Sequence, residues 1–277
     1  CRAFTPPSTM GSKAPQPLHV ERYGDGEKTI VFIPGLGGTT RYWSHSIGPL
    51  AERHRVVLVD LLGFGASPKP WTRYSVERHV SELHAILDSL GTITLVGHSL
   101  GALIAVAYAA RHRNQVENLV LIGMPYFGSE EAAYRYMRSG KVKWGFLYTN
   151  VVLVMITGIL TRRVFGWLLP YIRRDSPREV AEDLVKHTWR SSTSSLWEVV
   201  YRYDAADELR RLSGRTQVLM IHGQDDDIAP FAAIKQLAGD QPRWTLIALE
   251  GLDHHPFLRT PQTCLSQIEY LVSGDRP

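Results

Sequence analysis

Cysteines and cofactor motifs are scarce in this sequence. Only two cysteines, Cys1 and Cys264, occur among 277 residues, so a disulfide framework cannot supply the stability and no CxxC metal or redox site exists. The chain contains no HExxH motif, no P-loop and no GxGxxG turn after a first strand. We therefore expect no metal and no other cofactor.

Dense runs of charge are missing as well. The 31 Lys and Arg residues exceed the 27 Asp and Glu residues by four, and they are spread along the chain. Proteins that bind nucleic acid usually gather basic residues in one patch, so we expect no nucleic-acid partner. A content of 44% hydrophobic residues is typical of a globular chain and argues against disorder.

The N-terminal residues lack the apolar stretch of a signal peptide. Residues 1–17 are rich in Pro, Ser and Thr, and we interpret them as a flexible tail outside the fold. Cys1 is the residue that a processed lipoprotein would show at this position, but an upstream start explains it equally well. We expect a cytoplasmic protein and leave peripheral membrane contact open.

Short β-branched runs alternate with longer helical patterns along most of the chain. This alternation predicts an α/β fold with a mostly parallel sheet and helices on both faces. The expected strands are 18–23, 29–33, 56–60, 93–97, 118–122, 217–221 and 243–249. The expected helices are 75–90, 102–113, 231–238 and 261–272.

The alternation stops between residues 125 and 202, where helical patterns continue and no convincing strand occurs. We interpret 125–202 as a helical insertion after the strand 118–122. The core then consists of residues 18–124 and 203–277.

A Gly-x-Ser-x-Gly motif carries the chemistry. Residues 97–101 read Gly-His-Ser-Leu-Gly, and they join the apolar strand 93–97 to the small-residue helix 102–113. Strand, sharp turn and helix are the context of a nucleophile elbow, in which the serine oxygen is raised above the sheet at a helix N-terminus. Ser99 is therefore the predicted nucleophile.

With this motif in place, the chain resembles the α/β-hydrolase superfamily from about residue 18 to residue 272. Residues 31–38 resemble the first oxyanion loop of that family, with Pro34 where His is usual. The resemblance implies that the backbone N–H groups of Leu36 and Leu100 form the oxyanion hole. Residues 60–67 are similar to the family's D-x-x-G-x-G-x-S loop, which shapes the site without chemistry.

The resemblance also implies a catalytic acid and base in the order nucleophile, acid, base. Residues 223–230 match the pattern G-x-x-D-x-x-x-P, which selects Asp226 among three adjacent aspartates and leaves Asp225 as the alternative.

Residues 251–254 are similar to the family's G-x-G-H loop, which selects His254 as the base. Asp253 replaces the second glycine, and His255 remains a competitor. We interpret the other nine histidines, His98 included, as structural or surface residues.

These residues predict a serine hydrolase that cleaves a small carboxylic ester with a hydrophobic acyl or alcohol part through an acyl-enzyme. The same residues suit a lactone, a thioester or a carbon–carbon bond, and a low-turnover ligand receptor on this fold is a second class. Epoxide hydrolases and haloalkane dehalogenases carry Asp at the elbow, so Ser99 argues against both.

The insertion 125–202 falls where the α/β-hydrolase family carries a helical cap, and the resemblance implies that it covers the site and selects substrates. Within this cap, residues 144–161 carry no charge over eighteen residues. A membrane span is disfavoured, because it would place the two halves of one sheet on opposite sides of the bilayer. We favour helices that wall the substrate site with apolar side chains. The alternative is a helix resting on an anionic membrane surface. Basic residues flank this and the following apolar stretch at Lys141, Lys143, Arg162, Arg163, Arg173 and Arg174.

Overall fold

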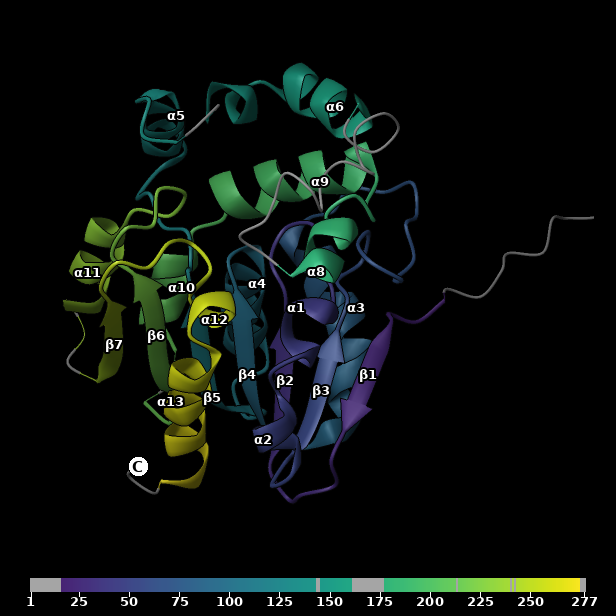
Figure 1. Ribbon diagram of the computed structural model, residues 1–277, viewed down its shortest axis with the longest axis vertical. Coiled ribbons are helices and arrows are strands. Elements are labelled where there is room, and N and C mark those ends of the chain that lie inside the picture. Colours follow the sequence, from purple (N-terminus) through teal and green to yellow (C-terminus); the bar gives the residue numbers. More distant parts are fainter. Residues whose placement is uncertain are drawn as a thin grey trace, which may run out of the picture.

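A seven-stranded sheet forms the centre of the protein, which we describe from a computed structural model (Figure 1). The structure describes residues 16–142, 145–160, 177–212, 214–239, 241 and 243–274. The strand order is β1-β3-β2-β4-β5-β6-β7, with β1 antiparallel to β3 and all other neighbours parallel. The strands are β1 (Val20–Tyr23), β2 (Thr29–Ile33), β3 (Arg55–Val59), β4 (Ile93–His98), β5 (Val116–Ile122), β6 (Gln217–Gly223) and β7 (Trp244–Leu249). The predicted α/β class with a mostly parallel sheet is confirmed.

Helices cover both faces of the sheet, so the central strands are buried on both sides and are mostly apolar in sequence. In β2, Val31 and Ile33 belong to one core cluster, whereas Ile30 and Phe32 belong to the other. The first cluster contains side chains of α3 (Val76–Leu87), α4 (Leu100–Arg111), α10 (Ala205–Arg210) and α11 (Phe231–Gly239). The second contains side chains of α1 (Arg41–Ser44), α2 (Gly48–Ala51), α12 (Pro256–Arg259) and α13 (Pro261–Ser273).

The four predicted core helices are present, with ends shifted by a few residues. Helix α3 starts after Ser75, whose side chain accepts the N–H of Arg78 as an N-cap, and the short helix η1 (Asp88–Leu90) follows it. Helix α4 begins two residues earlier than expected, directly after Ser99. That start is decisive for the site, because it places the serine at the helix N-terminus.

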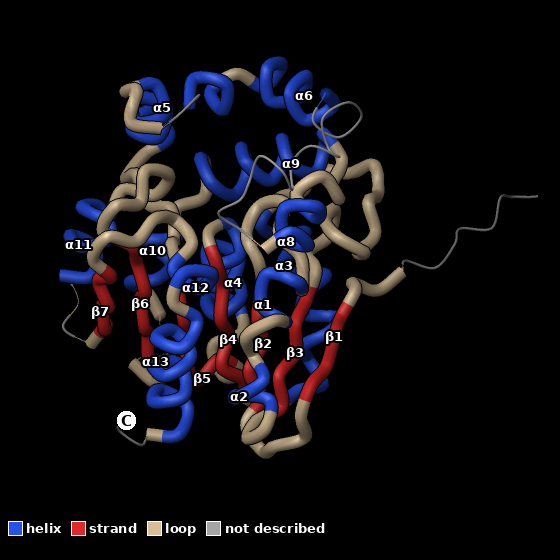
Figure 2. Tube along the Cα trace, viewed as in Figure 1, coloured by secondary structure: helices blue, strands red, loops and turns tan. Residues whose placement is uncertain are grey.

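The segment between β5 and β6 carries helices, and its described residues contain no strand. Apart from α10, which packs in the core, the described helices of this segment form what we call the cap: α5 (Glu130–Arg138), η2 (Gly145–Thr149), α6 (Val151–Leu160), α8 (Arg178–Asp183), α9 (Trp189–Ser195) and the π-helical turn η5 (Leu196–Tyr201). Figure 2 shows α9 lying across the upper end of the sheet, with α5 and α6 in a further layer above it.

Helix α6 departs from the expectation for the charge-free run. We expected residues 144–161 to wall the substrate site, but in α6 only Val154 is buried, and α9 lies between the helix and the sheet (Figure 1). Composition alone could not show that a second helical layer exists. Residues 144 and 161, and the arginines at 162, 163, 173 and 174, lie outside the described residues.

Among the described residues, none of the helices combines the length and apolar content needed to cross a bilayer.

One buried histidine joins the core to the cap and predicts acid sensitivity. His79 of α3 is fully buried with its Nε2 3.1 Å from Ser195 Oγ of α9, and burial lowers its pKa to about 4. The unfolded chain takes up this proton near pH 6.5, so the stabilisation is complete above that pH and is lost as the pH falls toward 4. We expect the free energy of unfolding from urea titrations to fall by roughly 3 kcal/mol from this residue across that range.

The variant His79→Gln is the control for this prediction. It should unfold with a shallower pH dependence between about pH 6.5 and 4, because its side chain does not titrate. Burial also lowers the pKa of His98, so part of the slope should remain. An unchanged slope in His79→Gln would contradict the assignment.

Candidate active site

Ser99 occupies a strained turn at the end of β4. Its φ of 51° and ψ of −120° make it the one non-glycine residue with positive φ in the described part of the chain. Such a conformation costs of order 1–3 kcal/mol and persists only where the surroundings impose it. At Gly101 a Cβ would lie 2.4 Å from the Pro34 oxygen, so α4 packs directly on the loop after β2. The turn thus places the serine hydroxyl at the N-terminus of α4 and beside that loop.

His254 and Asp226 reach Ser99 from the ends of two further strands. Asp226 follows β6, and His254 follows β7. Because parallel strands end at the same edge of the sheet, the loops after them meet there. His254 Nε2 lies 2.9 Å from Ser99 Oγ, and its Nδ1 lies 2.8 Å from Asp226 Oδ2. The structure therefore brings together the three residues that the sequence selected.

The protonation of this chain of hydrogen bonds follows from Asp226. Its burial favours the neutral acid, but hydrogen bonds from His222 and His254 outweigh that effect and hold the pKa well below its usual range. Its Oδ1 also accepts the backbone N–H groups of Ile228 and Ala229 at 2.9 and 2.8 Å. An ionised Asp226 can only accept, so His254 Nδ1 carries the proton and Nε2 is free to accept from Ser99.

The neighbouring candidates lie elsewhere. Asp225 and Asp227 are exposed, whereas Asp226 is buried. The ring of His255 lies against Tyr42, with Nδ1 3.4 Å from the phenol oxygen. Asp253, which stands where the family pattern has glycine, pairs with Arg259 of α12 and accepts the N–H of His255 at 2.9 Å. This aspartate therefore fixes the loop that carries His254.

Two histidines without an assigned role in the sequence support the site. His222 Nε2 is 2.9 Å from the Ala229 carbonyl oxygen and 3.2 Å from Asp226 Oδ2. His98 Nε2 is 2.9 Å from the His254 carbonyl oxygen. A carbonyl oxygen can only accept, so Nε2 is the protonated nitrogen in both rings. Their interpretation as structural residues stands, with the addition that they hold the acid and the base in place.

Two buried carboxylates fix the loop that contains Leu36. Asp60 accepts the N–H groups of Thr40 and Ala66, both at 2.7 Å, and so joins the 60–67 loop to the end of the Leu36 loop. Asp183 of the cap helix α8 accepts the Thr39 hydroxyl at 2.5 Å. The core and the cap therefore both hold this loop. Leu100, the other predicted oxyanion donor, is the first residue of α4 and follows Ser99 directly.

The sequence profile of the alpha/beta hydrolase fold matches residues 28–261, which is most of the chain and includes all the residues above. The chain belongs to the α/β-hydrolase family. The chain is therefore a member of a hydrolase enzyme family.

Several curated proteins are similar to this α/β-hydrolase in sequence. The chain is 30% identical to a pimeloyl-[acyl-carrier protein] methyl ester esterase from Aeromonas hydrophila over 92% of its own length and 99% of that protein. It is 25% identical to the probable lysophospholipase BODYGUARD 4 from Arabidopsis thaliana over 82% of its own length. The chain spans only 60% of the length of BODYGUARD 4 and 52% of the length of BODYGUARD 3.

Solved structures show the same α/β-hydrolase fold. A bromoperoxidase from Bacillus anthracis superposes with a TM-score of 0.74 at 23% identity, covering 93% of this chain and 95% of the other. The esterase EaEST from Exiguobacterium antarcticum superposes with a TM-score of 0.73 at 21% identity, covering 92% and 95%. At these identities the likeness establishes the fold.

An apolar cluster in the cap of this α/β-hydrolase contacts the loop that contains Leu36. Its buried members are Ala133, Met137, Val142, Val154, Leu196 and Tyr201. Leu36 is partly buried and packs against this cluster as well as against the main core. Apolar surface of the cap therefore lies next to the loop that the family uses for the oxyanion.

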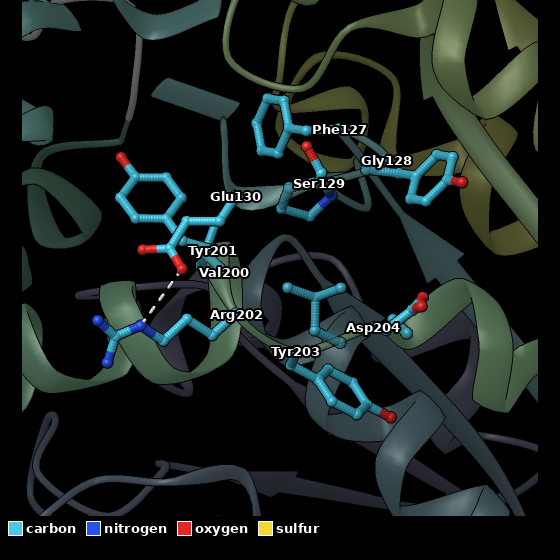
Figure 3. Close-up of a pocket in the computed structure, with 13 residues that line it drawn as sticks. Phe127, Gly128, Ser129, Glu130, Val200, Tyr201, Arg202, Tyr203 and Asp204 are labelled. Carbon is cyan, nitrogen blue, oxygen red and sulfur yellow. Dashed lines mark ion pairs between the residues drawn. The ribbon is translucent and has the colours of Figure 1, made fainter. Parts of the chain in front are cut away.

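A cavity of about 240 Å³ opens between the cap and α4 of this α/β-hydrolase (Figure 3). Its wall includes Leu103, one turn beyond Ser99, and the residues 125–130 and 200–205. An ion pair between Glu130 and Arg202, at 3.5 Å, lies across it. The wall mixes polar and apolar groups and does not include Ser99, Asp226 or His254, so the cavity is adjacent to the candidate site and distinct from it. In the described residues, no three His, Cys, Asp or Glu side chains are grouped as metal ligands.

Proposed function

We propose that this protein is a serine hydrolase in which Ser99, His254 and Asp226 form the catalytic triad. The observation that carries the proposal is the unbroken path from Ser99 Oγ to His254 Nε2 at 2.9 Å, and from His254 Nδ1 to Asp226 Oδ2 at 2.8 Å. A serine hydroxyl is a weak nucleophile near neutral pH and needs such a base, whose tautomer the carboxylate fixes.

The geometry supports an acyl-enzyme mechanism. Ser99 Oγ attacks the carbonyl carbon while His254 Nε2 takes the hydroxyl proton, and the imidazolium is stabilised by Asp226. We assign the resulting oxyanion to the backbone N–H groups of Leu36 and Leu100, each contributing about 3 kcal/mol to the transition state. Collapse expels the alcohol, which receives the proton from His254. Water then attacks the acyl carbon by the same steps and frees Ser99.

For the substrate we propose a small carboxylic ester with a hydrophobic acyl or alcohol part. The apolar cap cluster supports this class, because partly buried apolar side chains packed against it, among them Leu36, Phe127 and Trp197, keep apolar surface on this side of the protein. The names of the relatives point to ester substrates, namely a methyl ester for the Aeromonas hydrophila protein and lysophospholipids for the Arabidopsis thaliana proteins. A lactone remains the second candidate, favoured by a likeness to an enol-lactonase from Burkholderia xenovorans with a TM-score of 0.69.

A series of p-nitrophenyl esters tests this proposal. Each methylene that enters an apolar site contributes up to about 0.8 kcal/mol, so kcat/KM should rise by up to about fourfold per methylene until the site is full. Medium-chain esters should then exceed acetate. Labelling by a fluorophosphonate in parallel separates chemistry from specificity.

The outcomes of this series are distinct. Labelling with a preference for acetyl esters would keep the serine hydrolase and reject the hydrophobic substrate. A set of lactones is assayed beside the esters, and labelling with turnover of the lactones alone would select the second candidate. A protein that neither takes the label nor turns over any ester would instead be a receptor on this fold.

A further inference from the structure

Exposed apolar side chains are concentrated on one part of the cap. Seven large apolar side chains in the described residues are between 43% and 76% exposed, and six of them come from η2 and α6. We call these six the apolar ridge: Phe146, Tyr148, Val151, Val152, Ile156 and Leu160. The seventh is Trp71, in the loop that follows β3. Clustering of this kind marks an interaction surface, whereas single exposed apolar residues are ordinary.

The ridge faces away from the candidate active site. Helix α6 rests on α9, which lies between it and the sheet (Figure 1). Val152, Ile156 and Leu160 are spaced four residues apart and so share one helix face, and all three are exposed. Val154, on another side of the helix, is buried in the cap cluster. The outward face of α6 therefore neither packs in the core nor lines the site at Ser99.

The sequence around the ridge is strongly basic. Eight of the 31 Lys and Arg residues fall within residues 132–174, and none of the 27 Asp and Glu residues does. The rest of the chain therefore carries 23 basic against 27 acidic residues. In the described part, Arg138 donates from Nε to Thr149 Oγ1 at 3.0 Å, which places this cation beside η2, and Lys141 is exposed a few residues further on. The excess positive charge thus falls, in the sequence, on the segment that carries the apolar ridge, and its described members Arg135, Arg138 and Lys141 are all exposed.

We propose that the apolar ridge docks on the surface of an anionic phospholipid bilayer. An apolar helix face inserts at the level of the acyl chains, while neighbouring cations attract the anionic headgroups. A second copy of this chain fits less well, because a two-fold interface would bring two basic segments together. The docking goes beyond the proposed hydrolase function and is measured without turnover.

Flotation of the full chain with lipid vesicles tests the proposal. The protein should float with phosphatidylcholine vesicles that contain phosphatidylserine and should bind pure phosphatidylcholine much more weakly. Salt of about 1 M shortens the Debye length to about 3 Å and should weaken the binding. Partitioning to vesicles should fall by ~10-fold or more in the triple variant Val152→Gln, Ile156→Gln, Leu160→Gln. Glutamine is a good helix former, so the helix is kept while its apolar face is removed.

Two matched controls sharpen this test. Trp71→Gln removes the large apolar side chain that is most exposed among the described residues outside the ridge, and it should leave partitioning unchanged. The pair Arg135→Gln and Lys141→Gln should reduce the difference between the two vesicle types, whereas Lys28→Gln with Lys235→Gln, on the core, should not. The triple variant should keep fluorophosphonate labelling, which shows that the fold is intact.

Three results would overturn the proposal. One is the absence of binding to anionic vesicles. Another is an equal loss for Trp71→Gln and the triple variant, which would indicate unspecific adsorption. The third is a dimer in solution that the triple variant dissolves, which would assign the ridge to a second copy of the chain.

Discussion

Replacing Ser99 with alanine should abolish ester hydrolysis and covalent labelling by a fluorophosphonate. Its hydroxyl lies 2.9 Å from the imidazole of His254 at the N-terminus of α4, and the proposed mechanism forms its covalent bond at this oxygen. Loss of the nucleophile in such a triad typically costs on the order of 10⁶-fold in turnover, which leaves only binding and oxyanion stabilisation. Turnover and gel-based labelling give the two readouts.

The fold should survive this change, because the hydroxyl packs in no core cluster and its removal leaves the turn in place. Circular dichroism and the thermal midpoint of Ser99→Ala should match the parent protein. Labelling retained in the variant would show that another nucleophile reacts and would reject the assignment of Ser99.

Replacing His254 with alanine should lower turnover by at least ~1000-fold, because loss of one triad member leaves only oxyanion and binding catalysis. The adjacent variant His255→Ala is the matched control and should cost far less, since that ring lies against Tyr42. Steady-state kcat at saturating ester measures the difference.

The aspartates provide the corresponding comparison for the acid. Asp226→Asn should reduce kcat far more than Asp225→Asn or Asp227→Asn, because only the first of these side chains is buried and bonded to His254. If substitution of His255 or of Asp225 proved more damaging, that neighbouring residue would be the catalytic base or acid, and our assignment would be wrong by one position.

The sequence was sufficient to predict the strands of the sheet. Buried parallel strands such as β2 and β4 are mostly apolar, so their positions follow from the apolar pattern of the sequence. The G-x-S-x-G motif located Ser99 because a local turn determines its geometry. The choice of Asp226 over Asp225 and Asp227 rested on the family resemblance. The property that distinguishes Asp226 is its burial against His254, which lies in the loop after β7.

Tertiary contacts account for what the sequence did not provide. His222 and His98 bind the backbone carbonyls of Ala229 and His254, and a backbone partner leaves no residue pattern to read. The outward face of α6 was likewise hidden, because its apolar composition suits a buried wall as well as an exposed surface. Only the position of α9 distinguishes the two.

The bond between Asp183 and Thr39 has a consequence for protein engineering. Asp183 belongs to the cap, yet it holds the loop that contains Leu36, and its side chain is also paired with Arg41 and Lys186. A chimera that receives its cap from another enzyme would lose this carboxylate together with the old substrate preference. Such a chimera should have turnover only if the new cap places a carboxylate at the same position. A cap graft should therefore leave Asp183 in the parent sequence.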